Sequence, residues 1–130
     1  MSDNTTPQYG EFCWNELMTN YTEKAKSFYT TLFNWKTQSH DMGKMTYTMF
    51  MSGEKGIGGM LQTPKDKVGQ ISPHWMSYIS VENVDATLEK AESLGAKVKV
   101  PATAAGDFGI FAVIEDPTGA HIAFWQSFSK

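Results

Sequence analysis

The sequence predicts an α+β protein built from two βαβββ modules in a single domain, residues 1–130. The same order of one strand, one helix and three strands can be read twice along the chain. An offset of 62 residues superimposes Trp14 on Met76 and Leu32 on Leu94. Few side chains are identical between the halves, so the repeat lies in the pattern. With 130 residues and 41% apolar content, the chain can bury a proper core.

The first module is expected over residues 9–62. EFCWNELM (11–18) has the character of a strand, and a helix follows, with Asn20 as the expected N-cap and Glu23 completing a capping box. Five apolar residues then recur at helical spacing and predict one apolar stripe: Ala25, Phe28, Tyr29, Leu32 and Phe33. Asn34 follows them, where a left-handed residue is expected. Three strand-like pieces complete the module, joined by turns at DMGK and SGEK: WKTQSH, MTYTMFMSG and KGIGGMLQ.

The second module, residues 74–127, repeats this order after a linker at 63–73 (TPKDKVGQISP). HWMSYISV (74–81) is the first strand. A helical stripe follows and ends at Gly95 as the C-terminal cap; its members are Val84, Leu88, Ala91 and Leu94. The last three strands are KVKVPATA, FGIFAVIE and AHIAFWQS.

Composition excludes several classes of partner. A net charge of −3 without a basic run argues against nucleic acid and an anionic membrane surface. The apolar stretches are too short to span a membrane, and the polar N-terminus does not resemble a secretory signal. The single Cys13 forms no intramolecular disulfide, which favours the cytoplasm. Because it lies between Phe12 and Trp14, a buried inert thiol is favoured over a reactive one.

Three segments together resemble the vicinal oxygen chelate superfamily, which includes glyoxalase I, bleomycin-resistance proteins, fosfomycin-resistance proteins and extradiol dioxygenases. They are WNELMTNYTEKAKSFYTTLFNW, WMSYISVENVDATLEKAESLGAKV and DPTGAHIAFWQ. The resemblance covers about residues 9–127 and implies two modules that curl around a central cleft. It also implies a homodimer as the expected assembly. It is specific for the fold and not for a reaction, because the fold hosts lyases, dioxygenases, transferases and pure binders.

The resemblance also implies where metal-dependent members hold their ion, on the first and last strands of each module. These positions fall on Trp14, Met76 and Ala123, and on an unsettled residue of GIGGMLQ, where only Gln62 has an oxygen to offer. Indole and methyl groups have no lone pair for a metal, and thioether suits soft copper. We therefore expect no metal and no other cofactor.

Strand alternation predicts a ligand-binding face instead. In DPTGAHIAFWQ it places His121 on the same face as Ala123 and Trp125. The residues expected to line the cleft are Trp14, Glu16, Met18, Met76, Tyr78, His121, Ala123 and Trp125. Tyr47 is a further candidate neighbour. Such a lining of aromatic rings and thioethers favours a flat or apolar organic ligand. The alternative is that these large side chains pack on one another and leave no cavity.

The other histidines are weaker candidates. His74 lies two residues before Met76, the expected ligand position on this strand. It would serve as a metal ligand only if the strand register slipped by two residues. His40 is expected to end a strand, beside a turn at Asp41, and is predicted to be solvated.

Three functions remain open at this stage. The leading hypothesis is a metal-independent protein that binds a small organic ligand. The alternative is a glyoxalase-like lyase or isomerase acting on a small carbonyl compound or thiol conjugate. Its general base would be Glu16 or His121, and Tyr78 would donate to the oxyanion. The third is a dimeric scaffold without a ligand.

Overall fold

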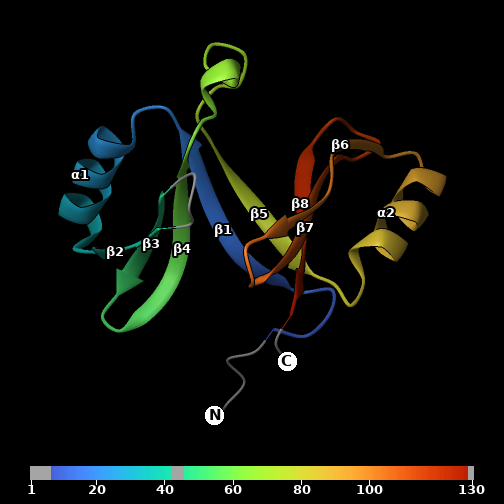
Figure 1. The fold of residues 1–130 in the computed structure, drawn as a ribbon, viewed down its shortest axis with the longest axis horizontal. Coiled ribbons are helices and arrows are strands. Elements are labelled where there is room, and N and C mark those ends of the chain that lie inside the picture. Colours follow the sequence, from blue (N-terminus) through green and yellow to red (C-terminus); the bar gives the residue numbers. More distant parts are fainter. Residues whose placement is uncertain (1–6, 42–45, 129–130) are drawn as a thin grey trace. The chain divides into compact units, whose positions relative to one another are not determined.

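The computed structural model describes residues 7–41 and 46–128, and its elements follow the predicted order. The chain divides into two compact units: Trp14–Met76, and the remainder from Ser77 onward with the segment that ends at Cys13. Both βαβββ modules are present, so the predicted α+β class is confirmed (Figure 1). The predicted DMGK turn falls largely on residues 42–45, outside the described residues.

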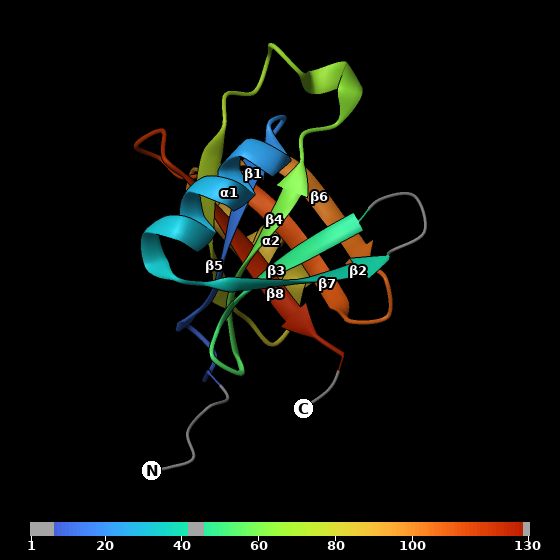
Figure 2. The ribbon, with the colours of Figure 1, turned by 90° about the vertical axis from the view of Figure 1, so that its left-hand side faces the viewer.

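The first module is a four-stranded mixed sheet with strand order β2-β3-β4-β1. Its elements are β1 Phe12–Thr19, α1 Thr22–Phe33, β2 Lys36–Asp41, β3 Thr46–Ser52 and β4 Lys55–Gln62. Strand β1 runs parallel to β4, whereas the β2–β3 and β3–β4 pairs are antiparallel. Helix α1 lies across one face of these strands (Figure 2). The other face therefore carries no helix of this module.

The second module repeats this plan with strand order β5-β8-β7-β6. A short 3₁₀ turn, η1 Lys65–Lys67, precedes this module. The elements of the second module are β5 His74–Ser80, α2 Val84–Ser93, β6 Lys97–Ala105, β7 Gly109–Glu115 and β8 His121–Ser127. Strand β5 is parallel to β8, as β1 is to β4. The offset of 62 residues relates the starts of β1 and β5, and the starts of α1 and α2.

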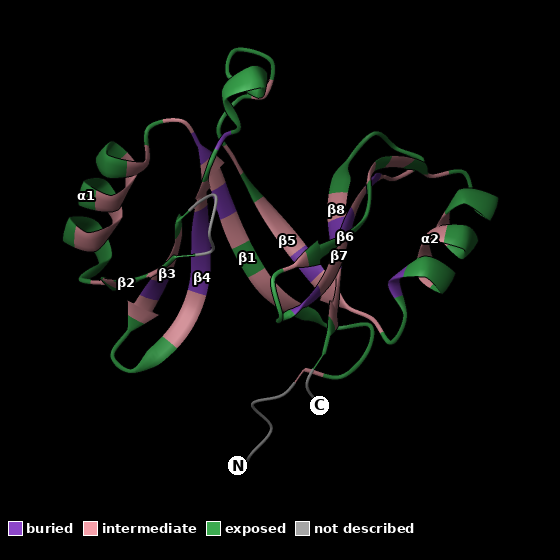
Figure 3. Ribbon diagram, in the orientation of Figure 1, coloured by how far each residue is buried: buried purple, intermediate pink, exposed green. Residues whose placement is uncertain are grey.

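Each module has its own core between helix and sheet, and these cores define the helix-bearing faces (Figure 3). In the first module, Leu17, Phe50 and Met60 are buried, and Tyr29 of α1 packs against them. In the second, the buried cluster consists of Val84, Ala112, Ile114 and Phe124. Because side chains alternate along a strand, the neighbours of these core residues point to the opposite face.

The predicted capping box at α1 is wrong. The helix begins at Thr22, and Tyr21 occupies the cap position without a side-chain hydrogen bond. The backbone carbonyl of Asn20 accepts from Nε2 of Gln62 at 3.3 Å, which ties the residue before the helix to β4. Thr19 Oγ1 instead accepts from the backbone N–H of Tyr21 at 3.1 Å and fixes the chain before the helix.

The predicted helix ends are confirmed. Asn34 follows α1 with φ 62°, and Gly95 follows α2 with φ 101°. After α2, the N–H groups of Gly95 and Ala96 bond to the carbonyls of Glu92 and Ala91. This is the Schellman arrangement, which glycine favours because it has no β-carbon.

The apolar stripe of α1 is only partly buried. Ala25 and Tyr29 pack against the core, whereas Phe28 and Leu32 are each 56% exposed and Phe33 is 52% exposed. Five apolar residues span a wider arc of the helix than the strands beneath it cover. Among the described residues, no helix combines the length and apolar character that crossing a bilayer requires.

Candidate functional site

The helix-free face of the first module carries the predicted residues Trp14, Glu16 and Met18. On β1 they alternate with Leu17, which lies in the core beneath α1. The parallel register pairs Glu16 with Gly59 of β4. Strand β3 adds Tyr47 to the same face, two residues before the Met49 that pairs with Gly59. Within this module, the structure brings Tyr47 together with the predicted residues of β1.

Tyr47 reaches β1 although β4 lies between the two strands. Its phenol passes over Gly59, where an added β-carbon would overlap the hydroxyl group. Nε1 of Trp14 donates a hydrogen bond to this hydroxyl at 2.7 Å. The hydroxyl is also hydrogen-bonded to the side chain of Glu16. Trp14, Tyr47 and Glu16 form what we call the Tyr47 network.

The network keeps the phenol of Tyr47 neutral. Burial raises the pKa of Tyr47 above its ordinary value, and the negative charge of Glu16 raises it further. The hydrogen bond from Trp14 favours the phenolate and so lowers the pKa, but the pKa of Tyr47 remains raised. Tyr47 therefore keeps its proton and donates a hydrogen bond to Glu16.

His40 lies near the end of a strand as predicted, but the prediction that it is solvated is wrong. It lies within β2 and pairs with Tyr47 in the antiparallel register, so both side chains share the helix-free face. Its Nε2 atom is buried and has no hydrogen-bond partner among the residues described. The turn signal at Asp41 placed the strand end correctly, but the strand order was needed to place the imidazole beside Tyr47.

The registers of the two modules show which residue of GIGGMLQ corresponds to Ala123. Glu16 pairs with Gly59 in the first module, as Tyr78 pairs with Ala123 in the second. The equivalent of Ala123 is therefore Gly59. Gln62 is not a candidate, because it pairs with Thr19 on the other face of the sheet.

The side chains at these positions do not fit a catalytic divalent metal. The positions that the resemblance implies, Trp14, Met76 and Ala123, and Gly59 beside Glu16 offer one thioether and no imidazole, carboxylate or thiolate. Across residues 7–41 and 46–128, no group of three or more His, Cys, Asp or Glu side chains is arranged to hold an ion.

The helix-free face of the second module contains Tyr78, Ala123 and Trp125. Ala123 is fully buried and Tyr78 is 8% exposed. The ring of Trp125 lies over Gly109 of β7, where an added β-carbon would meet it at 2.7 Å. Met76 stands two residues before Tyr78 on β5 and is the last residue of the unit Trp14–Met76. Both modules thus place an aromatic ring over a glycine.

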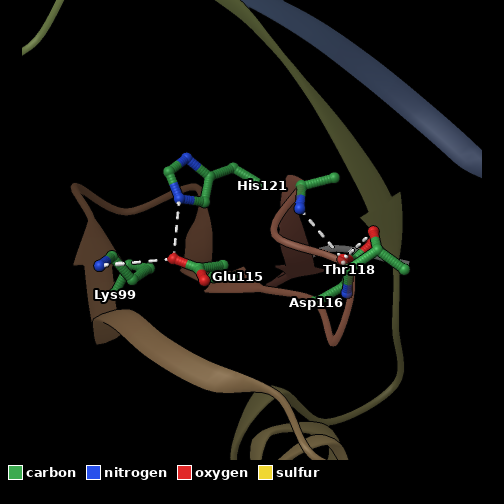
Figure 4. Close-up of polar contacts among 6 residues, drawn as sticks. Lys99, Glu115, Asp116, Thr118 and His121 are labelled. Atoms are coloured by element: carbon green, nitrogen blue, oxygen red, sulfur yellow. Dashed lines mark hydrogen bonds and ion pairs between the residues drawn. The ribbon is translucent and has the colours of Figure 1, made fainter.

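His121 lies at one end of this face, within a charged group that sequence reasoning missed (Figure 4). Its Nε2 is 3.6 Å from a carboxylate oxygen of Glu115, and the same oxygen lies 3.7 Å from Nζ of Lys99. The antiparallel register pairs Glu115 directly with His121. The side chain of His121 is 49% exposed, so it is not enclosed in an apolar wall.

The remaining sequence candidates are accounted for by local structure. Nδ1 of His74 lies 2.8 Å from the carbonyl of Ser72, within its own turn. Cys13 is half-buried, and burial raises the pKa of its thiol, which makes it less reactive.

A shallow hollow of about 300 Å³ is present in the first module, but on the helix-bearing face. It is lined by Leu17, Thr19, Tyr21, Lys24, Ala25, Phe28, Tyr29 and Pro73. None of the predicted ligand-binding residues lines it.

Comparison with known proteins identifies the family. The family model of the Glyoxalase/Bleomycin resistance protein/Dioxygenase superfamily matches residues 12–124. The chain belongs to this superfamily. The predicted resemblance is thereby confirmed, and the family is one in which the reaction must be argued from the site.

Two curated relatives extend beyond this chain. "Putative glyoxylase CFP32" of Mycobacterium tuberculosis is 34% identical over 116 residues, which are 88% of this chain and 44% of that protein. "Anthracycline biosynthesis protein DauV" of a Streptomyces species is 28% identical over an alignment of 130 positions that covers 90% of this chain and 47% of DauV. The chain therefore spans less than half the length of these superfamily relatives.

Solved structures show the same fold at low identity. Hypothetical protein BH1468 from Bacillus halodurans aligns with a TM-score of 0.70 at 11% identity, covering 95% of this chain and 98% of that one. Methylmalonyl-CoA epimerase from Mycobacterium tuberculosis aligns with a TM-score of 0.61 at 13% identity, covering 91% and 87%.

Proposed function

We propose that this superfamily member binds a small organic ligand without a metal, on the helix-free faces of its modules. The observation that supports this is the set of side chains at the four ligand positions, Trp14, Gly59, Met76 and Ala123. Two of them are apolar side chains large enough to contact a ligand, and none is a ligand of zinc, nickel, iron or manganese in proteins.

The neighbours of these positions suit an aromatic or apolar ligand. In the first module, Met18 and Tyr47 stand beside Trp14, which is half-buried. In the second module, Tyr78, His121 and Trp125 take the corresponding roles around Ala123. Aromatic rings stack on flat molecules, and thioethers adapt to irregular apolar surfaces.

A thermal-shift screen of aromatic and apolar compounds tests this proposal. We expect hits that raise the melting temperature equally with chelator and with added zinc or manganese. A ligand at a hundredfold excess over its Kd stabilises the fold by about 2.7 kcal/mol. Hits that require a divalent ion would contradict metal independence, and a screen without hits would contradict ligand binding.

Two tryptophan variants localise the binding. Trp14 donates to the hydroxyl of Tyr47, and Trp75 donates to the hydroxyl of Tyr29 at 3.1 Å, so both indoles make the same kind of bond within the unit Trp14–Met76. Trp14→Phe should weaken the binding of the compounds found in the screen. Trp75→Phe, in the aromatic cluster beneath α1, should leave their binding unchanged.

A second candidate function is a glyoxalase-like lyase or isomerase on a small carbonyl compound or thiol conjugate. It is favoured by the name of the CFP32 relative, a glyoxylase, and by the hydrogen bond between Glu16 and Tyr47. Glu16 or His121 would then be the general base. If Glu16→Gln and His121→Ala proteins turned over a discovered substrate as fast as the parent, this candidate would be excluded.

We propose a homodimer as the assembly, supported by the exposed apolar residues of α1. Phe28, Leu32 and Phe33 are each more than half exposed, and neighbouring exposed apolar residues are characteristic of interaction surfaces. Sedimentation equilibrium of the parent and of Phe28→Ser/Leu32→Ser tests this. A parent that sediments as a monomer would contradict it.

A further inference from the structure

We propose a second binding site, at the hollow on the helix-bearing face of the first module, for a small carboxylate with an apolar body. The hollow of about 300 Å³ lies on the opposite side of the sheet from the face to which the proposed function refers. Ligand pockets range from about 300 to 1,000 Å³, so this one suits a compound the size of a single substituted ring. All of its lining residues belong to the unit Trp14–Met76, so the site is complete within one unit.

The hollow has a buried floor and an exposed aromatic rim. Leu17 and Thr19 of β1 line it and are 5% and 4% exposed, and alternation places both on the helix-bearing face. Tyr21 and Phe28 also line it and are 61% and 56% exposed. An apolar ring in the hollow would contact Leu17 and cover part of these two aromatic rings, which supplies affinity. Of the residues assigned above to the dimer, Phe28 alone lines the hollow, so the two surfaces adjoin and do not coincide.

Lys24 makes the hollow selective for an anion. It is the one charged residue among those that line the hollow. Its ammonium group forms no ion pair with the residues that the structure describes. Glu23, its neighbour in α1, is exposed and is not a lining residue. A ligand carboxylate would therefore have a cation to pair with, whereas a cationic ligand would be repelled.

Thr19 adds a hydrogen-bond donor at the floor. Its hydroxyl oxygen accepts from the backbone N–H of Tyr21 at 3.1 Å. Across residues 7–41 and 46–128, the proton of this hydroxyl has no acceptor. A hydroxyl can donate one bond while it accepts another, and most buried donors are paired. A carboxylate oxygen in the hollow would pair this donor, in a bond that its charge strengthens.

Three fragments of nearly equal shape test the ligand class: 4-ethylbenzoate, 4-ethylbenzamide and 4-ethylbenzamidine, which are anionic, neutral and cationic at neutral pH. Their dissociation constants are measured by NMR titration of the protein. We expect the benzoate to bind about tenfold tighter than the benzamide, because the anion gains the pair with Lys24 and a charge-assisted bond from Thr19. The benzamidine should bind most weakly. The advantage of the benzoate should shrink with added salt, which screens the exposed charge of Lys24.

Two indole signals report where the fragments bind. Nε1 of Trp75 donates to the hydroxyl of Tyr29, which lines the hollow. Nε1 of Trp14 donates to Tyr47 on the helix-free face. In proton–nitrogen correlation spectra, 4-ethylbenzoate should shift the indole signal of Trp75 and leave that of Trp14 in place. Spectra of Trp14→Phe and Trp75→Phe assign the two signals.

Matched variants connect the preference to the two polar lining residues. Lys24→Gln should weaken the benzoate about threefold and leave the benzamide unchanged, because an exposed ion pair contributes modestly. Lys26→Gln makes the same chemical change on the same helix at a residue that does not line the hollow, and should change neither. Thr19→Val removes the hydroxyl and should weaken the benzoate, whereas Thr19→Ser keeps it and should restore the binding.

The possible outcomes separate this site from the proposed function. If the benzamide or the benzamidine binds as tightly as the benzoate, the ligand class is overturned. If the benzoate shifts the indole signal of Trp14 and not that of Trp75, it binds on the helix-free face, and the second site is overturned while the proposed function gains support. If none of the three fragments binds at millimolar concentration, the second site is also overturned, and the proposed function still depends on its own screen.

Discussion

The phenol of Tyr47 crosses β4 above the bare α-carbon of Gly59 and receives a hydrogen bond from Nε1 of Trp14 at 2.7 Å. This relationship joins β3 to β1 across an intervening strand. It also places a hydroxyl where a side chain at the superfamily's ligand position would begin. In this module a neutral phenol is thereby held between Trp14 and Glu16.

Gly59→Ala is expected to destabilise the protein by about 1–3 kcal/mol, because its β-carbon would overlap the hydroxyl of Tyr47. Urea unfolding measures the effect. In a Tyr47→Ala background the overlap is gone, so the same substitution should cost much less. An equal cost in both backgrounds would show that Tyr47 does not occupy this space.

Tyr47→Phe is expected to cost about 1–3 kcal/mol, because it leaves the N–H of Trp14 without its acceptor and removes a donor from Glu16. Tyr29→Phe is the matched control. It removes the acceptor of Trp75, which is 41% exposed and can turn to water, so its cost should stay below about 1 kcal/mol. A reversed order of the two variants in chemical denaturation would contradict the Tyr47 network.

Stability should fall in alkali through Tyr47. Its pKa is raised in the folded protein, so its contribution is fully present below the unfolded value of about 10. Above that pH the unfolded chain loses the proton first, and the contribution is lost progressively as pH rises toward the folded pKa. The stability gap between the parent and Tyr47→Phe should therefore shrink above about pH 10. A gap independent of pH would contradict the raised pKa.

Asp116 should make the stability of the protein fall in acid, the opposite pH dependence to that of Tyr47. Oδ1 accepts from Oγ1 of Thr118 at 2.7 Å and from the backbone N–H groups of Thr118 and Ala120 at 2.8 and 3.1 Å (Figure 4). These bonds, led by the side chain of Thr118, lower the pKa of Asp116. Its contribution is present above the unfolded value of about 3.9 and is lost as pH falls through the folded pKa.

Asp116→Asn isolates this charge, because the amide keeps an acceptor oxygen. The parent should be more stable than the variant at neutral pH, and the difference should vanish in acid. Equal stabilities at neutral pH would show that the turn does not depend on the carboxylate.

The repeated architecture was predictable because it depends on local signals. Apolar alternation and turn residues located each strand, and Asn34 and Gly95 marked the helix ends through their tolerance of positive φ. The faces of β1 and β8 followed from alternation alone, which is why Trp14 and Glu16 were assigned together.

The details of the site depend on which strands are neighbours, and that information is not local. The path of Tyr47 over Gly59 requires β4 to lie between β3 and β1. The same is true of His40, which shares a face with Tyr47, and of Glu115, which pairs with His121. Asn20 is not the cap because the helix begins one residue later than the local pattern indicates, at Thr22.

Metal content tests the central claim most directly. The protein should be purified without chelator from cells supplied with zinc, nickel, iron and manganese, and then subjected to elemental analysis. We expect far less than one equivalent of any divalent metal per chain, because Trp14, Gly59, Met76 and Ala123 provide no suitable donors. A stoichiometric divalent metal that survives purification would contradict it.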